Sequence, residues 1–409
     1  MGKKVLMFGW ELPPQNSGGL GVACFGLSKS LAKGGVEVTF VLPRKNEKNP
    51  FFNVVSVKRI CNYKEIEVNS LLSPYLSSSS YKRVLFGVQG GDIYGRTLLD
   101  EVSRYAEYAK DIALSEEFDV IHAHDWLSFG AGVTAKKVSG KPLIAHIHAT
   151  EFDRGGVGRV NQEVYNREKE GMEEADKVIT VSNFTKGIIM KHYGIPSEKI
   201  EVVHNGIDDT ESKSFEKEEL LKTFKDAGYK TVAFIGRITV QKGPDYFLKM
   251  AKKVLDYNKK VIFIIAGSGD MERQIMHQAG ELGISDKVFF TGFLRGKKLY
   301  NLFREADIFV MPSISEPFGL TPLESLINGT PVLISKQSGV SEVLKNALKV
   351  DFWDTDEMAN KILTALSSEP MRVCLARNGE IEAKKIKWDS VADKCISIYN
   401  SLLSVSKSR

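Results

Sequence analysis

Two glutamates in one short stretch of the chain could bind the hydroxyl groups of a ligand. The stretch covers residues 315–324 and reads Ser-Glu-Pro-Phe-Gly-Leu-Thr-Pro-Leu-Glu. Glu316 lies near its start and Glu324 at its end. Carboxylates on both sides of a phosphate pocket suit a sugar on one side and a ribose on the other. Two simpler interpretations remain open: Glu316 is a surface loop residue, or Glu324 only completes a helix capping box.

The middle of this stretch has the composition of a loop that leads into a helix. Pro317 and Gly319 disfavour a helix in its first half. Thr321 is a good N-cap, with Pro322 at the first helical position. The amides of Gly319, Leu320 and Thr321 would then lie at a helix N-terminus. Unpaired N–H groups and the helix dipole favour an anion such as a diphosphate at that position.

A pair of cations follows another strand-like run, residues 231–236. Arg237 ends this run and Lys242 precedes the next helical pattern, so both could converge on one anionic group. Together they could neutralise a departing nucleoside diphosphate without a metal ion. On their own, these two side chains would equally suit a solvated loop.

Glycine-rich turns follow two further strand-like runs. Gly18 and Gly19, in the sequence Ser-Gly-Gly-Leu-Gly, would let a phosphate approach the backbone. Their spacing is not G-x-G-x-x-G, which argues against a nicotinamide or flavin enzyme. Gly267, in the sequence Gly-Ser-Gly, could line a nucleotide but suits a plain turn equally well.

Histidines and an aspartate end two strand-like runs in the first half of the chain. Strand alternation places His146 and His148 on one face, and His124 with Asp125 ends the preceding run. Zinc would use such histidines, but no third and fourth ligand is spaced along the sequence to join them, so we expect no metal site. Residues 354–356, Asp-Thr-Asp, begin a helical pattern and are better explained by N-capping than by metal binding.

The strand-like runs alternate with helical patterns in two series. Several runs are continuously apolar, as expected for parallel strands that are buried on both faces. Strands that alternate with helices indicate βαβ units. The first series comprises residues 3–10, 36–43, 118–124, 141–148, 176–182 and 200–206, and the second comprises residues 231–237, 260–269, 287–293, 307–313 and 330–336.

This repetition predicts an α/β protein of two Rossmann-like doubly wound domains that face each other across a cleft. The predicted domains are residues 1–207 and 208–387, since a charged stretch over 208–224 separates the two series. Residues 62–100 break the rhythm and are expected to form a long irregular insertion on the rim of the cleft. An amphipathic helix over residues 388–403 closes the chain.

The composition excludes several classes of protein. The chain has 409 residues, 43% hydrophobic and 26% charged, which is ordinary for globular domains. A net charge of +5, spread along the chain, is too mild to indicate a nucleic-acid partner. The four cysteines form no CxxC pair or disulfide framework, and neither a signal peptide nor a transmembrane run is complete. We therefore expect a cytoplasmic protein, with peripheral membrane contact left open.

In combination, these motifs resemble the retaining nucleotide-sugar glycosyltransferases of family 4, which have the two-domain GT-B fold. The nearest resemblance is to the glycogen and starch synthase group. The matching motifs are SGGLG (17–21), HAHDW (122–126), HIHATE (146–151), VITVS (178–182), HNGID (204–208), IGR with QKG (235–243) and EPFGLTPLE (316–324). The E-x7-E pair with R-x4-K upstream is specific as a set, whereas each piece alone is weak.

The resemblance implies a role for each matching residue. Arg237 and Lys242 would hold the diphosphate of the donor as it leaves. Glu316 would bind the transferred sugar, and Glu324 would bind the ribose. The backbone amides expected to face the sugar and phosphates are those of Phe318, Gly319 and Leu320.

The resemblance also assigns residues of the first domain. Gly19 would approach the phosphate, His148 would lie beside the transferred sugar near its anomeric centre, and Asp125 would lie close to the acceptor hydroxyl. The last helix, residues 388–409, would return to the first domain.

The implied activity is transfer of a sugar, glucose before others, from a nucleoside diphosphate to a carbohydrate acceptor, with retained configuration and without cofactor or metal. Extension of an α-glucan is the first expectation, and a lipid, exopolysaccharide or small-molecule acceptor is the alternative. Asn16-Ser17 stands where bacterial starch-type synthases usually carry Lys, so the donor stays open between ADP-glucose, UDP-glucose and another sugar. A non-catalytic sugar-nucleotide-binding module and a sugar-nucleotide epimerase are the rival functions.

Overall fold

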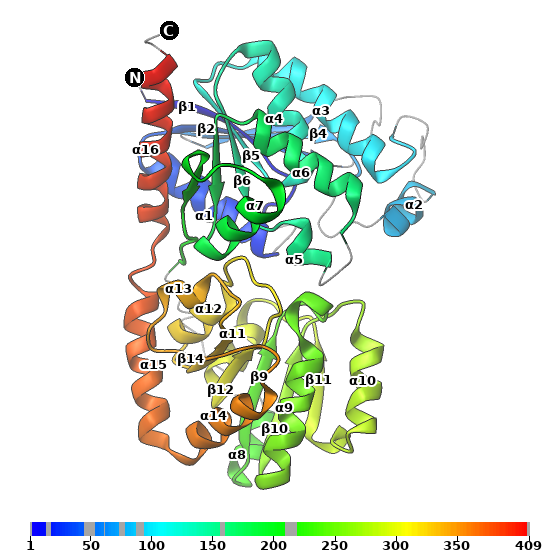
Figure 1. The fold of residues 1–409 in the computed structure, drawn as a ribbon, viewed down its shortest axis with the longest axis vertical. Helices are drawn as coiled ribbons and strands as arrows, with labels where there is room; N and C mark the ends of the chain where they lie inside the picture. Colours follow the sequence, from blue (N-terminus) through cyan, green and yellow to red (C-terminus); the bar gives the residue numbers. More distant parts are fainter. Residues whose placement is uncertain are drawn as a thin grey trace. The chain divides into compact units, whose positions relative to one another are not determined.

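The computed structural model describes residues 2–13, 18–44, 54–60, 62–72, 78–86, 94–155, 160–208 and 219–406. The chain forms two compact units, each built around one sheet (Figure 1). Unit 1 contains Met1–Glu151, Val160–Gly206 and Lys387–Arg409, and unit 2 contains Phe152–Arg159 and Ile207–Ile386. The junctions near residues 207 and 387 lie beside the predicted ones, whereas residues 152–159 group with unit 2 instead of the first domain.

The sheet of unit 1 has the strand order β3-β4-β2-β1-β5-β6-β7-β8, and every neighbouring pair except β3 and β4 is parallel. Its strands are β1 (Lys4–Phe8), β2 (Glu37–Arg44), β3 (Val54–Ile60), β4 (Tyr63–Asn69), β5 (Val120–His124), β6 (Leu143–Ile147), β7 (Lys177–Thr180) and β8 (Ile200–Val202). Its helices are α1 (Gly19–Lys33), α2 (Ser78–Phe86), α3 (Leu98–Ser115), α4 (Trp126–Ser139), α6 (Gln162–Glu174), α7 (Asn183–Tyr193) and α16 (Trp388–Ser406), while α5 (Glu151–Gly155) begins where unit 1 gives way to unit 2.

The sheet of unit 2 is parallel throughout and has the order β11-β10-β9-β12-β13-β14. Its strands are β9 (Lys230–Ile235), β10 (Val261–Ala266), β11 (Val288–Gly292), β12 (Ile308–Met311), β13 (Val332–Ser335) and β14 (Leu348–Val350). Its helices are α8 (Glu219–Asp226), α9 (Pro244–Tyr257), α10 (Glu272–Glu281), α11 (Gly296–Glu305), α12 (Thr321–Ile327), α13 (Val340–Val343), α14 (Thr355–Ser367) and α15 (Glu369–Ala383).

The prediction of two α/β domains with parallel sheets is confirmed, and each predicted run contains a strand. The apolar runs became central strands because helices bury them: Leu27 of α1 and Val391 of α16 share one core with strand residues Val5, Val120 and Ile144.

The last helix, α16, packs against α1 in unit 1 (Figure 1). Gly26 makes this close packing feasible, because a Cβ atom there would lie 2.3 Å from the Trp388 ring. The hydroxyl of Tyr399 adds a hydrogen bond of 2.8 Å to Nδ1 of His122. The end of the chain is thereby fixed to the first sheet.

The prediction of an irregular insertion over residues 62–100 is wrong for the described part of that segment. β4 pairs in parallel with β2 and antiparallel with β3, and helix α2 follows. Ile66 and Val68 are both buried and share one face of the strand, at its two-residue period. The polar residues Glu67 and Asn69, which alternate with them and are buried as well, hid the strand in the sequence. Of the serine cluster, Ser78 to Ser80 begin α2, whereas Ser77 and Gly90-Gly91 lie outside the described residues.

None of the helices in the described ranges is both long enough and apolar enough to cross a membrane.

Candidate active site

The predicted cations and carboxylates of unit 2 lie at the point where its strand order reverses. From β9 the sheet continues through β10 to β11, and from the neighbouring β12 it continues through β13 to β14. The loops after β9 and β12 therefore leave the same edge of the sheet side by side. Crevices at such reversals are the usual ligand sites of doubly wound sheets.

The loop after β9 is locked to the loop after β12 through the residues that flank Lys242. Gly243 has φ of 65°, and a Cβ atom there would lie 2.2 Å from the carbonyl oxygen of Pro312. The amide of Ile314 donates to the carbonyl oxygen of Gln241 at 2.9 Å. Because Lys242 lies between these two anchors, its position relative to the second loop is fixed by backbone contacts.

Lys242 contacts Glu316 directly. The Nζ atom of Lys242 donates to Oε2 of Glu316, and the Ser313 hydroxyl lies 3.3 Å from the same oxygen. The amide of Glu316 donates to Gln337, and its carbonyl oxygen accepts from Gly339. Glu316 is only 6% exposed, so the simpler interpretation as a surface loop residue is wrong.

Arg237 lies on the loop after β9, the loop that also carries Lys242. Its Nη2 donates to Oε1 of Gln241 at 2.9 Å, a partner that sequence reasoning missed although the i, i+4 spacing could have indicated it. Beside it, Gly267 has φ of 152°, and a Cβ atom there would lie 1.8 Å from the carbonyl oxygen of Gly236. The structure thus gives Gly267 a packing role that supports the Arg237 loop.

Helix α12 starts differently from the prediction. Its N-cap is Leu320, whose φ of −77° and ψ of −33° are already helical, and no side chain caps it. The expected N-cap at Thr321 and its capping box with Glu324 are therefore wrong. Gly319, with φ of 99°, ends the loop. The helix therefore starts one residue earlier than the preferences of Thr321 and Pro322 indicated. The amides of Gly319, Leu320 and Thr321 still lie at the start of the helix.

Glu324 is not used for capping and lies mostly buried in the first turn of α12. Burial raises the pKa of this carboxyl to about 7. Phe318, by contrast, packs its side chain into the interior with 2% exposure, and its carbonyl oxygen accepts from Val340 at 2.7 Å. Only the backbone of Phe318 is therefore suited to a ligand.

In unit 1 the strand order reverses between β1 and β5. Helix α1 begins at Gly19 after the N-cap Gly18, whose amide donates to Oε1 of Glu11 at 2.6 Å. The Gly18 amide is therefore already bonded within the protein. No atom lies within 4 Å of the Cβ position of Gly19, so the described chain leaves space there. Asn16 and Ser17 lie outside the described residues.

Asp125 follows β5 with φ of 60° and ψ of 171°, a region that residues other than glycine rarely occupy. It is 4% exposed. Its Oδ1 accepts from the amide of His148 at 2.7 Å and from the amide of Ala149 at 3.3 Å. The aspartate thus fixes the main chain that carries His148.

The structure gathers four histidines into one buried cluster. Parallel register places His124 opposite His146 on the neighbouring strand, and the rings of His146 and His148 stack with centroids 4.2 Å apart. His122 contacts His146 at 3.0 Å between Nε2 and Nδ1, and His124 contacts His148 at 3.0 Å between Nδ1 and Nε2. Burial lowers the pKa of His122 and of His148 to about 3, so both rings are neutral at ordinary pH.

Sequence spacing indicated no further ligands beside these histidines, but the structure brings additional ligand-type atoms close to them; the expectation that no metal binds there stays a prediction. Ligand atoms of Cys24, His124 and His148 lie within 4.8 Å of one another, and so do those of His122, His124 and His146. Spacing along the sequence could not show this, because strand register and helix packing bring the residues together. The aspartates at 354–356 behave as predicted: Asp354 caps α14 by accepting from the amide of Glu357 at 2.9 Å.

Two family models match the chain, one in each half. "Glycosyltransferase Family 4" matches residues 17–211, and "Glycosyl transferases group 1" matches residues 215–382. An uncharacterized glycosyltransferase of Methanocaldococcus jannaschii is 30% identical to this chain, with 97% of each protein covered.

Other similar proteins have named activities. A glycogen synthase of Mycobacterium tuberculosis is 27% identical over 84% of this chain and 80% of its own length. A D-inositol 3-phosphate glycosyltransferase of Mycolicibacterium smegmatis is 29% identical over 71% of this chain and 69% of its own length. The solved structure of sucrose-phosphate synthase from Thermosynechococcus elongatus has a TM-score of 0.76 at 18% identity, covering 98% of this chain and all of its own, and it shares the fold.

Proposed function

We propose, because this chain belongs to the family 4 glycosyltransferases, that it transfers glucose from a nucleoside diphosphate to an α-glucan chain with retained anomeric configuration. The observation that carries this proposal is the contact between Lys242 and Glu316 at the carboxyl ends of two neighbouring strands. This contact supports the proposal because a cation, which would suit a diphosphate, lies beside a carboxylate, which would suit sugar hydroxyls.

In the proposed reaction, Arg237 and Lys242 stabilise the negative charge that develops on the diphosphate as its bond to the sugar breaks. The amides at the start of α12 add fixed dipoles directed at the same charge. In other enzymes a metal ion stabilises the charge on a leaving diphosphate. Here the fixed cations and amides would stabilise that charge, so we propose that the transfer step needs no metal ion. Glu316 binds hydroxyls of the transferred sugar, and Glu324 binds the ribose.

Retention would follow from displacement on one face of the sugar, as the resemblance to the family implies. The bond from the anomeric carbon to the diphosphate breaks through an oxocarbenium-like state, and the bond to the acceptor oxygen forms on the same face. The proton of the acceptor hydroxyl passes to a diphosphate oxygen. In unit 1, we propose that Gly19 approaches phosphate and that His148, positioned by Asp125, serves the reacting sugar and acceptor.

The test is product analysis with purified full-length protein. UDP-glucose and ADP-glucose are each offered with glycogen or maltooligosaccharides, and NMR reports the configuration of the new linkage. An α-linked glucan product at a rate that EDTA leaves unchanged supports the proposal. Donor binding without any product points to a binding module, and an isomerised donor without acceptor product points to an epimerase.

A small-molecule acceptor is the second candidate. The observation that favours it is the D-inositol 3-phosphate glycosyltransferase of M. smegmatis, which is 29% identical to this chain. Transfer to inositol phosphate or another small polyol in the same assay, with no elongation of glycogen, would select this candidate over glucan extension.

A further inference from the structure

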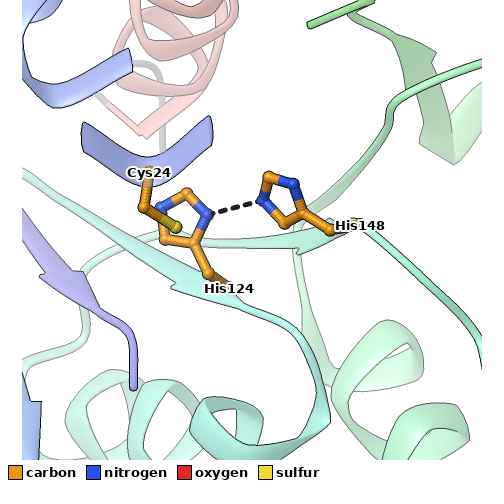
Figure 2. A group of neighbouring side chains, drawn as sticks. All are labelled: Cys24, His124 and His148. Carbon is orange, nitrogen blue, oxygen red and sulfur yellow. Dashed lines mark hydrogen bonds between the residues drawn. The ribbon is translucent and has the colours of Figure 1, made fainter. Parts of the chain in front are cut away.

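Two consecutive residues of unit 1 bind different parts of His148. Asp125 accepts from the main-chain amide of His148, and the residue before it, His124, bonds to the ring (Figure 2). Nδ1 of His124 lies 3.0 Å from Nε2 of His148. The two side chains are 0% and 9% exposed, respectively. The contact is therefore a hydrogen bond between two buried rings.

The ring of His124 is itself held in place. It stacks on the ring of His122 with centroids 4.5 Å apart, and it lies nearly parallel to the ring of Phe40 at 6.0 Å. The carbonyl oxygen of His124 accepts from the hydroxyl of Ser128 at 2.7 Å, which ties the end of β5 to the start of α4. His124 can therefore act as a fixed partner for the ring of His148.

The hydrogen bond links the protonation of the two rings. Burial lowers the pKa of both histidines well below neutrality, so each neutral ring carries one proton on one of its nitrogens. One proton lies in the bond between Nδ1 of His124 and Nε2 of His148. If His124 donates it, both rings are protonated at Nδ1, and if His148 donates it, both are protonated at Nε2. The two rings must therefore have the same tautomer.

The outer nitrogens of the pair are Nε2 of His124 and Nδ1 of His148. Both atoms are buried, and among the described residues neither has a hydrogen-bond partner. Only one of them carries a proton, because the rings share a tautomer. A buried polar atom without a partner costs about 1–3 kcal/mol, a cost that apolar side chains of the same shape would avoid. Stability alone therefore does not account for this pair.

Cys24, the third residue in Figure 2, does not replace either hydrogen-bond partner. Burial raises the pKa of its thiol, which stays neutral and is a weak donor and acceptor. Its sulfur makes no hydrogen bond to the outer nitrogen of either ring. The bond between the two histidines is therefore the strongest described constraint on the tautomer of His148.

We propose that His124 is a positioning residue for His148, which fixes Nδ1 as the ring nitrogen that meets the substrates and sets whether that atom donates or accepts a hydrogen bond. The inference rests on the proposed function, in which His148 serves the reacting sugar and acceptor. Because Nε2 is bonded to His124, Nδ1 is the ring nitrogen that remains for a sugar oxygen. A rotated ring would remove that atom, and the opposite tautomer would exchange a donor for an acceptor.

The first experiment reads the tautomers of the full-length chain without substrate. Two-bond proton–nitrogen NMR spectra of protein labelled in its seven histidines distinguish a proton on Nδ1 from one on Nε2. His124→Asn and His148→Asn each remove one set of signals and thereby assign the pair. We expect both rings of the wild type to be protonated on the same nitrogen. Protonation on different nitrogens, or a charged ring at neutral pH, overturns the inference.

The second experiment measures sugar transfer. His124→Phe keeps a flat ring in the stack but leaves Nε2 of His148 without a partner. His124→Asn keeps an amide near the position of Nδ1 that can donate or accept. We expect His124→Phe to lower kcat by about 10- to 100-fold, with the donor KM changed by less than about twofold, and His124→Asn to recover most of this loss.

Tyr399→Phe is the matched control, because it removes a buried hydrogen bond from His122 in the same cluster without touching His148. It should keep the kcat of the wild type. Equal kcat in His124→Phe and wild type, or equal losses in the Phe and Asn variants, overturns the positioning role and leaves the proposed function standing. A wild type that forms no product overturns the proposed function and this role together. The NMR spectra of the wild type test the shared tautomer even if His124→Phe folds poorly.

Discussion

The buried carboxyl of Glu324 should make the stability of unit 2 fall as the pH rises through neutrality. Burial raises the pKa of this group from its ordinary 4.5 to about 7 in the folded chain. Between these two values the folded state keeps a proton that the unfolded state has lost, so rising pH favours unfolding. Below this window both states are protonated, and above it both are ionised. Between pH 5 and pH 8 the free energy of unfolding should fall by about 2.5 kcal/mol through this one group.

Glu324→Gln removes the titration and keeps the shape of the side chain. Urea unfolding would be followed at pH 5 and pH 8 by hydrogen exchange of β9 and β12, which reports on unit 2 alone. The difference between wild type and Glu324→Gln should change by about 2.5 kcal/mol between the two pH values. Glu369→Gln, at an exposed glutamate of α15 in the same unit, is the matched control and should track the wild type.

Parallel loss of stability in wild type and Glu324→Gln would refute this reasoning, because the carboxyl would then ionise in the folded chain as it does in water. If the carboxyl behaves as expected, the donor adds a second effect. In the proposed donor complex, ribose hydroxyls would donate to Glu324 and stabilise its ionised form. Donor affinity should then rise with pH across neutrality in the wild type and stay level in Glu324→Gln.

Three further substitutions test individual contacts. Lys242→Ala should lower kcat by about 100-fold or more at saturating donor, because one cation at developing charge is lost; near-wild-type turnover would remove Lys242 from the mechanism. Gly267→Ala should cost about 3 kcal/mol or more in unfolding free energy, since its Cβ would lie 1.8 Å from the Gly236 oxygen; an unchanged urea midpoint would contradict that packing. Tyr399→Phe should cost about 1–3 kcal/mol by leaving a buried nitrogen of His122 unpaired, and equal stability at pH 7 would argue that the bond contributes nothing.

Much of the fold could be predicted from the sequence because buried parallel strands carry a strong local signal. The strands β10 and β12 are apolar at every position, and the structure buries every residue of both strands, as it does in β5. The β4 strand was missed because only one of its faces is apolar and clusters of turn-forming residues surround it. The start of α12 was misplaced by one residue because φ of 99° at Gly319 overrides the capping preference of Thr321.

The two parts of the candidate site differ in how far the sequence could predict them. In unit 2, the rule that ligand residues follow strand ends was enough to select Arg237, Lys242 and Glu316. It could not show that Lys242 touches Glu316, because that contact depends on which strands are neighbours. In unit 1, the histidine cluster depends on the register of β5 against β6 and on helix packing that brings in Cys24. Such contacts between distant elements leave no periodic trace in the sequence.

The conformation of Asp125 explains why an aspartate, and not a glycine, follows β5. A glycine would adopt its φ of 60° without strain, whereas a residue with a side chain pays about 1–3 kcal/mol there. Glycine, however, offers no acceptor for the amides of His148 and Ala149, which Oδ1 of Asp125 binds at 2.7 and 3.3 Å. Leaving the buried amide of His148 unpaired would cost about 1–3 kcal/mol, and the half-buried amide of Ala149 would lose its bond as well. The strained aspartate is therefore the less costly solution where the main chain at His148 and Ala149 must be held in place.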